Sequence, residues 1–340
     1  MKKRSRIFIP ILFCIAIVIL IIIASSIGVV LIPVEDVVSI ILSKIGVPLN
    51  SSFPQHVELT VLELRLPRIL ISLFAGASLA ICGCAFQSIF RNPICDPYIL
   101  GISSGASLGA AVAFILGWDL FFFGVTFPAL ITALATLIAI VAIARFGSKQ
   151  STYTLLLTGI AINFLISAVI TLLMVTHQQS MQKIIFWTMG SFATVSWNDL
   201  LLLLPIMSCI VFLLFFYAKD LNIIQLGSET AKSLGVNTQK ITIITLSLAS
   251  LLIASVVSIC GVIGFIGLIV PHMVRIMVGN NTRTVFIYSL FIGAVFMLIA
   301  DTIARTVAIP SELPVGSITA IAGAPYFIFL LLRKKKIYTI

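Results

Sequence analysis

Residues 199–240 read DLLLLLPIMSCIVFLLFFYA followed by KDLNIIQLGSETAKSLGVNTQK. The first part, 199–218, is almost entirely apolar and has the length that an α-helix needs to cross the hydrocarbon core of a bilayer. The second part, 219–240, is the longest polar interruption in the second half of the chain. Together they predict a membrane-spanning helix that leads into a loop exposed to water.

The composition extends this interpretation to the whole chain. Of its 340 residues, 60% are hydrophobic and 9% are charged, whereas a soluble domain is about half apolar and about a quarter charged. The apolar runs are long and unbroken, so they indicate helices and not the alternating strands of a membrane barrel. We therefore expect an all-α integral membrane protein, with residues 1–340 forming a single transmembrane domain.

The sequence predicts ten spans. The third is short and rich in Gly and Ser, and the eighth is short and contains Pro271, which should kink or break it. The spans are expected at 7–30, 66–88, 97–116, 122–145, 152–175, 199–218, 240–260, 264–278, 284–306 and 315–332.

The distribution of charge predicts the orientation of these spans. With ten spans and a cytoplasmic N-terminus, sixteen of the 21 Lys and Arg residues fall on the cytoplasmic side, but only three of the 11 acidic residues do. This is the bias that membrane proteins show, so both termini should be cytoplasmic. The net charge of +10 is therefore a signal of orientation, and no nucleic-acid partner is expected.

The 219–240 loop has the pattern of a short helix. Ser228 suits an N-cap, Glu229 follows in the first turn, and Gly235 stands where a helix often ends. Ala231 and Leu234 should share an apolar face. Two interpretations remain open here: the helix docks into a partner, or the loop is a polar turn that lies on the membrane surface.

Three arginines oppose the charge bias at the outer ends of spans. Arg65 and Arg68 are three residues apart and share a helix face, and Arg305 follows Asp301 by one turn. They could receive an acidic partner from outside, or they could pair with Glu63, Asp301 or lipid headgroups.

Several kinds of chemistry are missing from the sequence. It contains no phosphate-binding GxxxxGK[ST] loop, and its six cysteines and three histidines form no pattern that ligates a metal. We expect no catalytic residue, no metal site and no cofactor. The spans hold almost no ionisable residue apart from Asp301, which argues against a transporter driven by an ion gradient. That class and a membrane anchor or assembly subunit remain the alternative functions.

Five segments, in this order, are specific in combination. They are LRLPRIL (64–70), GASLAICGCAFQSIFRNPICDPYILGISSGAS (76–107), FWTMGS (186–191), GVIGFIGLIVPHMVR (261–275) and ADTIARTVAIPSELPVGSITAIAGAPYFIFLL (300–331). With them the chain resembles the FecCD-type permease subunits of ABC importers for ferric siderophores, haem and cobalamin, from about residue 10 to 335. The resemblance implies the permease fold of type II ABC importers, with about ten transmembrane helices.

The resemblance also implies a function and partners. The chain would be the permease subunit of an importer in the cytoplasmic membrane of a bacterium, and it would carry a ferric siderophore or a haem- or cobalamin-like chelate. It would not be an enzyme, because a separate ATPase on the cytoplasmic face would hydrolyse ATP. An extracytoplasmic substrate-binding protein, in some systems a lipoprotein, and a second permease chain, identical or homologous, would complete the assembly.

The resemblance assigns four groups of residues. Coupling to the ATPase would use Gly227, Ser228, Glu229, Ala231, Leu234 and Gly235. Docking of the binding protein would use Arg65, Arg68 and Arg305. The inner gate would include Asn92, Pro93, Ser148, Ser151 and Thr152, and the outer mouth Trp187, Gly190 and Ser191.

Overall fold

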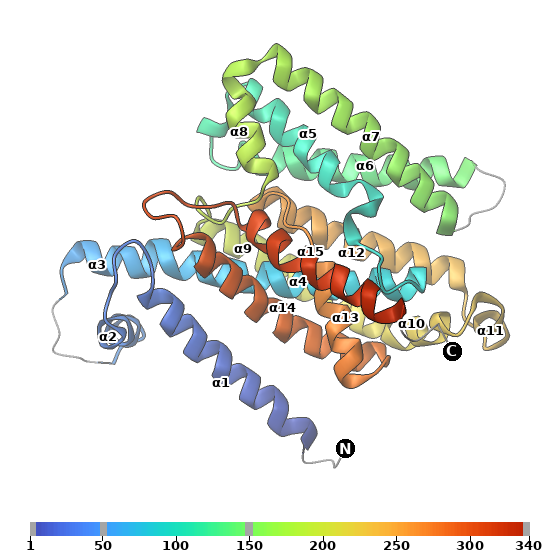
Figure 1. The fold of residues 1–340 in the computed structure, drawn as a ribbon, viewed down its shortest axis with the longest axis horizontal. Helices are drawn as coiled ribbons and strands as arrows, with labels where there is room; N and C mark the ends of the chain where they lie inside the picture. The colour runs from blue at the N-terminus through green and yellow to red at the C-terminus, as the bar shows by residue number, and fades with distance from the viewer. Residues whose placement is uncertain (1–4, 48–52, 147–151, 336–340) are drawn as a thin grey trace.

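A computed structural model describes residues 5–47, 53–146 and 152–335, and in these residues all regular secondary structure is helical (Figure 1). Ten apolar helices match the ten predicted spans, with shifts of a few residues at their ends. They are α1 (Ser5–Ser26), α4 (Leu66–Phe90), α5 (Ile102–Ile115), α6 (Thr126–Phe146), α7 (Thr152–Thr176), α9 (Trp197–Phe216), α12 (Thr238–Cys260), α13 (Ile266–Val278), α14 (Thr282–Ala304) and α15 (Val315–Lys335).

The helix α4 is the centre of the bundle. It continues α3 (Gln55–Leu59) and the π-helical turn η1 (Thr60–Arg65), and 89% of its apolar span is buried inside the chain. Its closest neighbours are α14, α13, α12 and α9. A Cβ atom at Gly293 of α14 would lie 2.5 Å from the carbonyl oxygen of Gly76, so the absence of a side chain lets these two helices touch through their backbones.

The helices α5, α6 and α7, with the short α8 (Gln178–Thr188), form a group beside this centre, at the top of Figure 1. Within the group α5 packs on α6 and α7. Only 11% of the apolar span of α7 is buried inside the chain. This helix therefore offers most of its surface to lipid or to another chain.

Pro271 was expected to kink or break the eighth span, and it does not break it, because α13 runs through this residue from Ile266 to Val278. A proline has no N–H to give to the carbonyl four residues earlier, which here belongs to Gly267. The side-chain amide of Gln87 on α4 donates to that carbonyl at 3.4 Å and to the carbonyl of Leu268 at 3.0 Å. A neighbouring helix thus satisfies the group that the proline leaves free.

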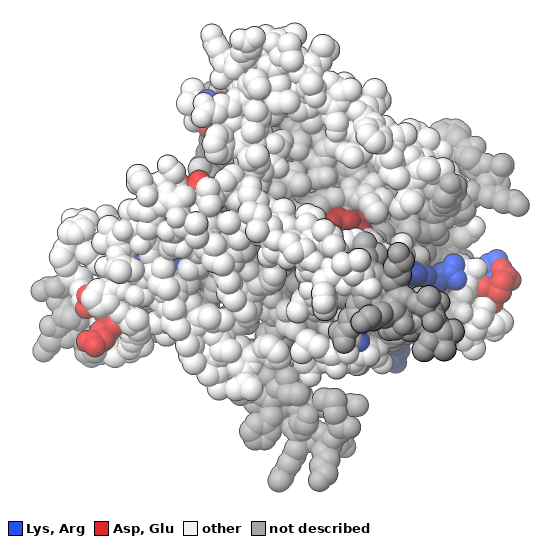
Figure 2. All heavy atoms as spheres, viewed as in Figure 1, with Lys and Arg blue, Asp and Glu red and all other residues white. Residues whose placement is uncertain are grey.

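The short helices gather at the two ends of the bundle. At one end lie α2 (Val34–Lys44), α3 and α8, and at the other α10 (Ala218–Gln225) and α11 (Ser228–Ser233) (Figure 1). The helix α1 begins and α15 ends toward the end that carries α11. Figure 2 shows that most charged side chains on the visible face lie near the two ends, with a largely uncharged surface between them. This is the distribution that a bilayer requires.

Candidate functional site

The polar turn α11 projects from the end of the bundle that carries α10 and α11. This is the cytoplasmic end and is called the inner end below; the opposite end, with α2, α3 and α8, is the outer end. The helix begins at Ser228 itself, so the prediction of Ser228 as the N-cap is wrong by one position. Gly227 takes the cap position with φ of 122°, a conformation that favours glycine and lets the chain turn sharply out of α10. A pair of charges decorates the turn: Lys232 Nζ lies 3.3 Å from Glu229 Oε1, and these side chains are 61% and 88% exposed.

The end of α11 is fixed by backbone geometry. Gly235 has φ of 81° and donates its N–H to the carbonyl of Lys232 at 2.9 Å, and Val236 donates to the carbonyl of Ala231 at 2.9 Å. These two bonds form a Schellman motif, which confirms the prediction that Gly235 terminates the helix. Since the left-handed conformation suits glycine, a side chain here would strain the turn.

The predicted apolar face of α11 is wrong. Ala231 is fully buried, whereas Leu234 is 59% exposed and lies at the C-cap, beyond the last helical residue. Leu226, just before the turn, is 67% exposed. The turn is therefore seated on its own bundle through Ala231 and presents Leu226, Leu234 and the charged pair to the outside.

The residues predicted for the inner gate are described only in part. Asn92 and Pro93 follow α4, and Asn92 Oδ1 accepts a hydrogen bond from the N–H of Ile94 at 3.0 Å. Thr152 is the first residue of α7, and Ser148 and Ser151 lie outside the described residues. The inner gate remains a prediction.

At the outer end, the three arginines are buried. Arg65, Arg68 and Arg305 are 7%, 9% and 4% exposed, so none presents its guanidinium freely to the outside. Arg65 donates to the carbonyls of Ser25, Ser26 and Val30, where the chain leaves α1. The helix macrodipole makes the C-terminal end of a helix a favourable place for a cation.

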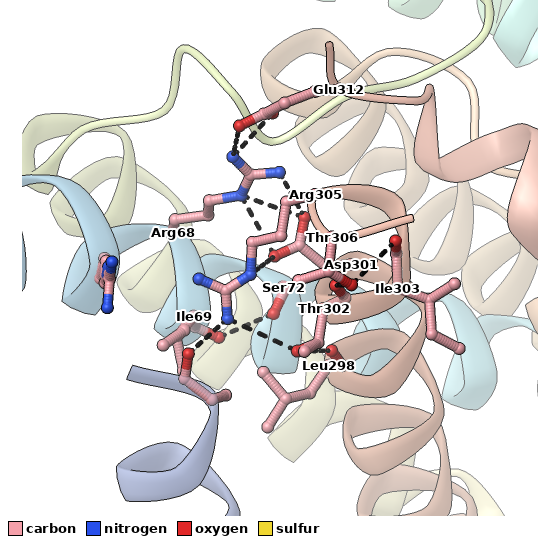
Figure 3. A network of polar contacts seen from close by, with 12 residues as sticks. Arg68, Ile69, Ser72, Leu298, Asp301, Thr302, Ile303, Arg305, Thr306 and Glu312 are labelled. Carbon is pink, nitrogen blue, oxygen red and sulfur yellow. Dashed lines mark hydrogen bonds and ion pairs between the residues drawn. The ribbon is translucent and has the colours of Figure 1, made fainter. Parts of the chain in front are cut away.

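Arg68 and Arg305 enclose one fully buried carboxylate, that of Asp301 (Figure 3). Arg68 Nη2 donates to Asp301 Oδ1 at 2.8 Å, and Nε donates to both carboxylate oxygens at 3.1 Å. Arg305 Nε lies 3.9 Å from Asp301 Oδ2, and its Nη2 donates to the carbonyl of Ala24.

A second carboxylate approaches Arg68 from the surface. Glu312 Oε1 and Oε2 accept from Arg68 Nη1 at 3.0 and 2.9 Å, and the Glu312 side chain is 34% exposed (Figure 3). Asp301 was an expected partner of the arginines, whereas Glu312 was not expected from the sequence. Thus the Nε and Nη2 groups of Arg68 bind the carboxylate of Asp301, which is buried in the core, and its Nη1 group binds the carboxylate of Glu312, which water can reach.

The residues predicted for the outer mouth lie where three backbone segments meet. Gly190 has φ of 72°, its carbonyl accepts from the N–H of Val315 at 3.0 Å, and Ser191 donates its N–H to the carbonyl of Cys260 at 2.8 Å. A Cβ atom on Gly190 would lie 2.6 Å from the carbonyl oxygen of Val262. Glycine is therefore required both by conformation and by space.

A cavity of about 680 Å³ opens beside this junction. Aromatic and polar side chains line it, among them Phe122, Trp187, Ser191, Asp199 and Glu312. A smaller hollow of about 340 Å³ lies between α5, α7 and α8, and its lining mixes apolar residues with seven residues that carry hydroxyl or amide groups: Ser103, Ser104, Ser107, Asn163, Ser167, Thr171 and Thr188. On α7 three of these polar residues are four positions apart and share one face.

A bundle of apolar helices with polar turns at both ends defines a multi-pass membrane protein. The chain matches the model of the FecCD transport family over residues 15–333, and it belongs to that family. It is 40% identical over 284 residues to the cobalamin import system permease protein BtuC of Halobacterium salinarum, covering 84% of this chain and 76% of the relative.

Two further relatives are also permease proteins of transport or import systems. The hemin transport system permease protein HmuU of Yersinia pestis is 39% identical, with 81% of this chain and 84% of the relative covered. The iron(3+)-hydroxamate import system permease protein FhuG of Bacillus subtilis is 37% identical, with 81% and 84% covered. A solved structure of an inward-facing metal-chelate type ABC transporter superposes with a TM-score of 0.83 at 31% identity, covering 96% of this chain and 99% of that one.

The family comparison decides between the functional classes that the sequence left open. Members of the family are permease subunits of ABC importers, and this chain is such a subunit, not an enzyme. ATP hydrolysis belongs to a separate subunit, and a substrate-binding protein delivers the cargo. The alternatives of an ion-driven transporter and a membrane anchor are therefore set aside.

Proposed function

We propose that this chain forms the pathway for a metal chelate across the cytoplasmic membrane of a bacterium, with a ferric siderophore as the substrate class and haem or cobalamin as alternatives. Three relatives carry names that specify cobalamin, hemin and iron-hydroxamate, and each of these compounds is a metal ion held by a multidentate organic ligand. The hollow between α5 and α7 fits this proposal, because neutral hydroxyl and amide groups accept a polar ligand without binding it as an ion.

A second permease chain, identical or homologous, completes the pathway in this proposal. The observation that favours it is the exposed span α7, of which 11% is buried inside the chain. Asn163, Ser167 and Thr171 follow one face of this helix, and hydrogen-bonding groups are costly to expose to lipid tails. A paired chain that places this face beside a water-filled path removes that cost.

The observation that carries the coupling role is the geometry of α11. Gly227, Ser228, Glu229, Ala231, Leu234 and Gly235 form a turn that is clamped to the bundle at Ala231 and ends in a Schellman motif. The side of the turn that faces away from the bundle exposes Leu226 and Leu234 beside the charged pair, which is the composition of a small protein interface. We assign this side to the cytoplasmic ATPase.

Docking of the binding protein is proposed at the opposite end, near Arg65, Arg68 and Arg305, but it requires an exchange of partners. All three guanidinium groups already bind internal acceptors. The acceptor that is most easily replaced is Glu312, because its side chain is 34% exposed. An acidic residue of the binding protein would take its place on Arg68. Glu312→Gln is expected to tighten docking severalfold, whereas a reduced affinity would contradict this arrangement.

Reconstitution tests the proposed function. The chain is assembled in proteoliposomes with its ATPase and binding protein, and uptake of a ferric hydroxamate, hemin and cobalamin is measured with and without ATP. Uptake of at least one chelate that requires ATP and both partners is expected. Uptake by the chain alone that disappears when an ion gradient is collapsed would contradict the proposal.

A further inference from the structure

A cluster of polar side chains, Gln225, Ser88, Arg275 and Thr282, lies next to α11, where α10 meets α4, α13 and α14. We propose that Gln225, the last residue of α10, is a positioning residue that transmits the displacement of α11 to these three helices. The inference rests on the proposed coupling role of α11. It adds the mechanical connection between that turn and the membrane-spanning helices.

Gln225 binds all three helices through one side chain. Its Nε2 donates to Thr282 Oγ1 of α14 at 2.8 Å and to Ser88 Oγ of α4 at 3.2 Å. Its Oε1 accepts from Arg275 Nη1 of α13 at 3.3 Å. The amide therefore uses its donor and its acceptor ends at the same time, which neither a shorter polar residue nor an apolar one can do.

The partners of Gln225 are also bonded to one another. Arg275 Nη2 donates to Ser88 Oγ at 2.8 Å and to the carbonyl of Cys84 at 3.4 Å, and Ser88 Oγ donates to that same carbonyl at 2.8 Å. A second bond ties α10 to α14, because Asn222 Oδ1 accepts from the N–H of Thr282 at 2.7 Å. Ser88 and Thr282 are fully buried, so their bonds are shielded from water.

The connection from this cluster to α11 is short. Only Leu226 and Gly227 separate Gln225 from Ser228, and both are held by backbone bonds to α10, from Leu226 N–H to the Ile223 carbonyl at 3.0 Å and from Gly227 N–H to the Ile224 carbonyl at 3.1 Å. The N–H of Ala231 then donates to the Gly227 carbonyl at 2.9 Å. A pull on α11 therefore moves α10 with it.

Apolar contacts alone would not transmit this motion in a defined direction. Leu221 and Ile224 bury α10 against the bundle, but such contacts are non-directional and allow sliding. The hydrogen bonds of Gln225 are directional, and breaking them inside the bundle leaves buried polar groups unpaired. Separation of the cluster would break these bonds, so in this arrangement the three helices follow α10.

The test compares Gln225→Leu, Gln225→Glu and the control Gln55→Leu in the reconstituted importer with its ATPase and binding protein. The readout is the number of ATP molecules hydrolysed per chelate transported, for whichever of ferric hydroxamate, hemin and cobalamin the wild type carries. Gln225→Leu should raise this ratio about fivefold or more, the lower range of allosteric coupling. Gln225→Glu should stay within about twofold, because a carboxylate still accepts from Arg275 and can accept a hydrogen bond from the Thr282 hydroxyl in place of the one that the amide donated to it.

The control Gln55→Leu makes the same chemical change at an exposed residue of α3, so this variant should keep the wild-type ratio. A Gln225→Leu variant that loses thermal stability but keeps the wild-type ratio overturns the inference, because a merely structural role predicts that outcome. If Gln225→Leu does not assemble, Thr282→Val removes one of the three bonds and should raise the ratio by a smaller factor; an unchanged ratio again overturns the inference. A wild type without ATP-driven uptake would instead refute the proposed function.

Discussion

At the inner end of the bundle the turn α11 exposes a charged pair, whereas at the outer end three arginines are buried against carboxylates and carbonyls. The Glu229 and Lys232 side chains are 88% and 61% exposed, but those of Arg68 and Arg305 are 11% and 5% exposed. The inner charges are free to meet a partner. The outer charges first serve the fold.

The difference follows from what each charge would meet without its partner. An exposed ion pair is solvated either way, so its contribution to stability is small. A buried guanidinium that loses its acceptors has given up its hydration without compensation, so the outer cluster contributes to the stability of the fold. Mutations should therefore affect stability at the outer end and coupling at the inner end.

The largest expected effect comes from Asp301→Asn. Loss of this carboxylate leaves the Arg68 and Arg305 guanidinium groups buried with one charge fewer to balance them, and we expect a loss of about 3–5 kcal/mol in the free energy of unfolding. Thermal unfolding of the purified chain in detergent measures it. The matched control is Glu312→Gln, whose partly exposed carboxylate should cost about 1 kcal/mol or less. Equal losses for the two variants would remove the distinction between core and surface carboxylates.

The next effect should come from Arg65→Met, which keeps the length of the side chain but removes the donors. The carbonyls of Ser25, Ser26 and Val30 then lose the cation that holds the end of α1. Charged hydrogen bonds of this kind contribute about 1.5–3 kcal/mol, so unfolding should occur at a clearly lower temperature. Unchanged stability would mean that Arg65 is available for another role at the outer surface.

A smaller effect on stability, with a large one on transport, is expected for Gly235→Val. The residue has φ of 81°, and a β-branched side chain in the left-handed region costs about 1–2 kcal/mol locally. The end of α11 should then shift, and ATP-driven uptake should fall while ATP hydrolysis continues. Retention of full uptake would argue against α11 as the coupling element.

The smallest effect on stability should come from exchanging the exposed pair, Glu229→Lys with Lys232→Glu. The interaction contributes about 0.5 kcal/mol or less, so the unfolding temperature should remain within error of the wild type. Binding of the ATPase should weaken, because the charges then face their partners with reversed sign. A pull-down with the purified ATPase at low and high salt measures this binding.

Much of the architecture was predictable from the sequence because lipid imposes a simple rule on it. All ten apolar helices lie where the runs of hydrophobic residues predicted them, and Gly235 ends α11 as its conformational freedom indicated. The continuity of α13 through Pro271 was not predictable, because the compensating amide belongs to Gln87, far away in the sequence.

The environment of the arginines was predicted only in part, because Asp301 was an expected partner but Glu312 was not. Arg68 and Asp301 are 233 positions apart, and Glu312 is a further partner that no local pattern connects to Arg68. The cluster at Gln225 combines residues from four helices, none of them ionic except Arg275. Sequence position predicted the side of the membrane on which these groups lie, but tertiary packing determines whether they are exposed.

The most direct test of the account is the accessibility of residue 232. A Lys232→Cys variant is treated with a membrane-impermeant maleimide in intact cells and in inverted membrane vesicles, with the unmodified chain as background. We predict labelling only in inverted vesicles, and protection from it when the purified ATPase subunit is added. Labelling of Cys at this position in intact cells would contradict the account, because α11 would then lie on the side of the membrane that no ATPase can reach.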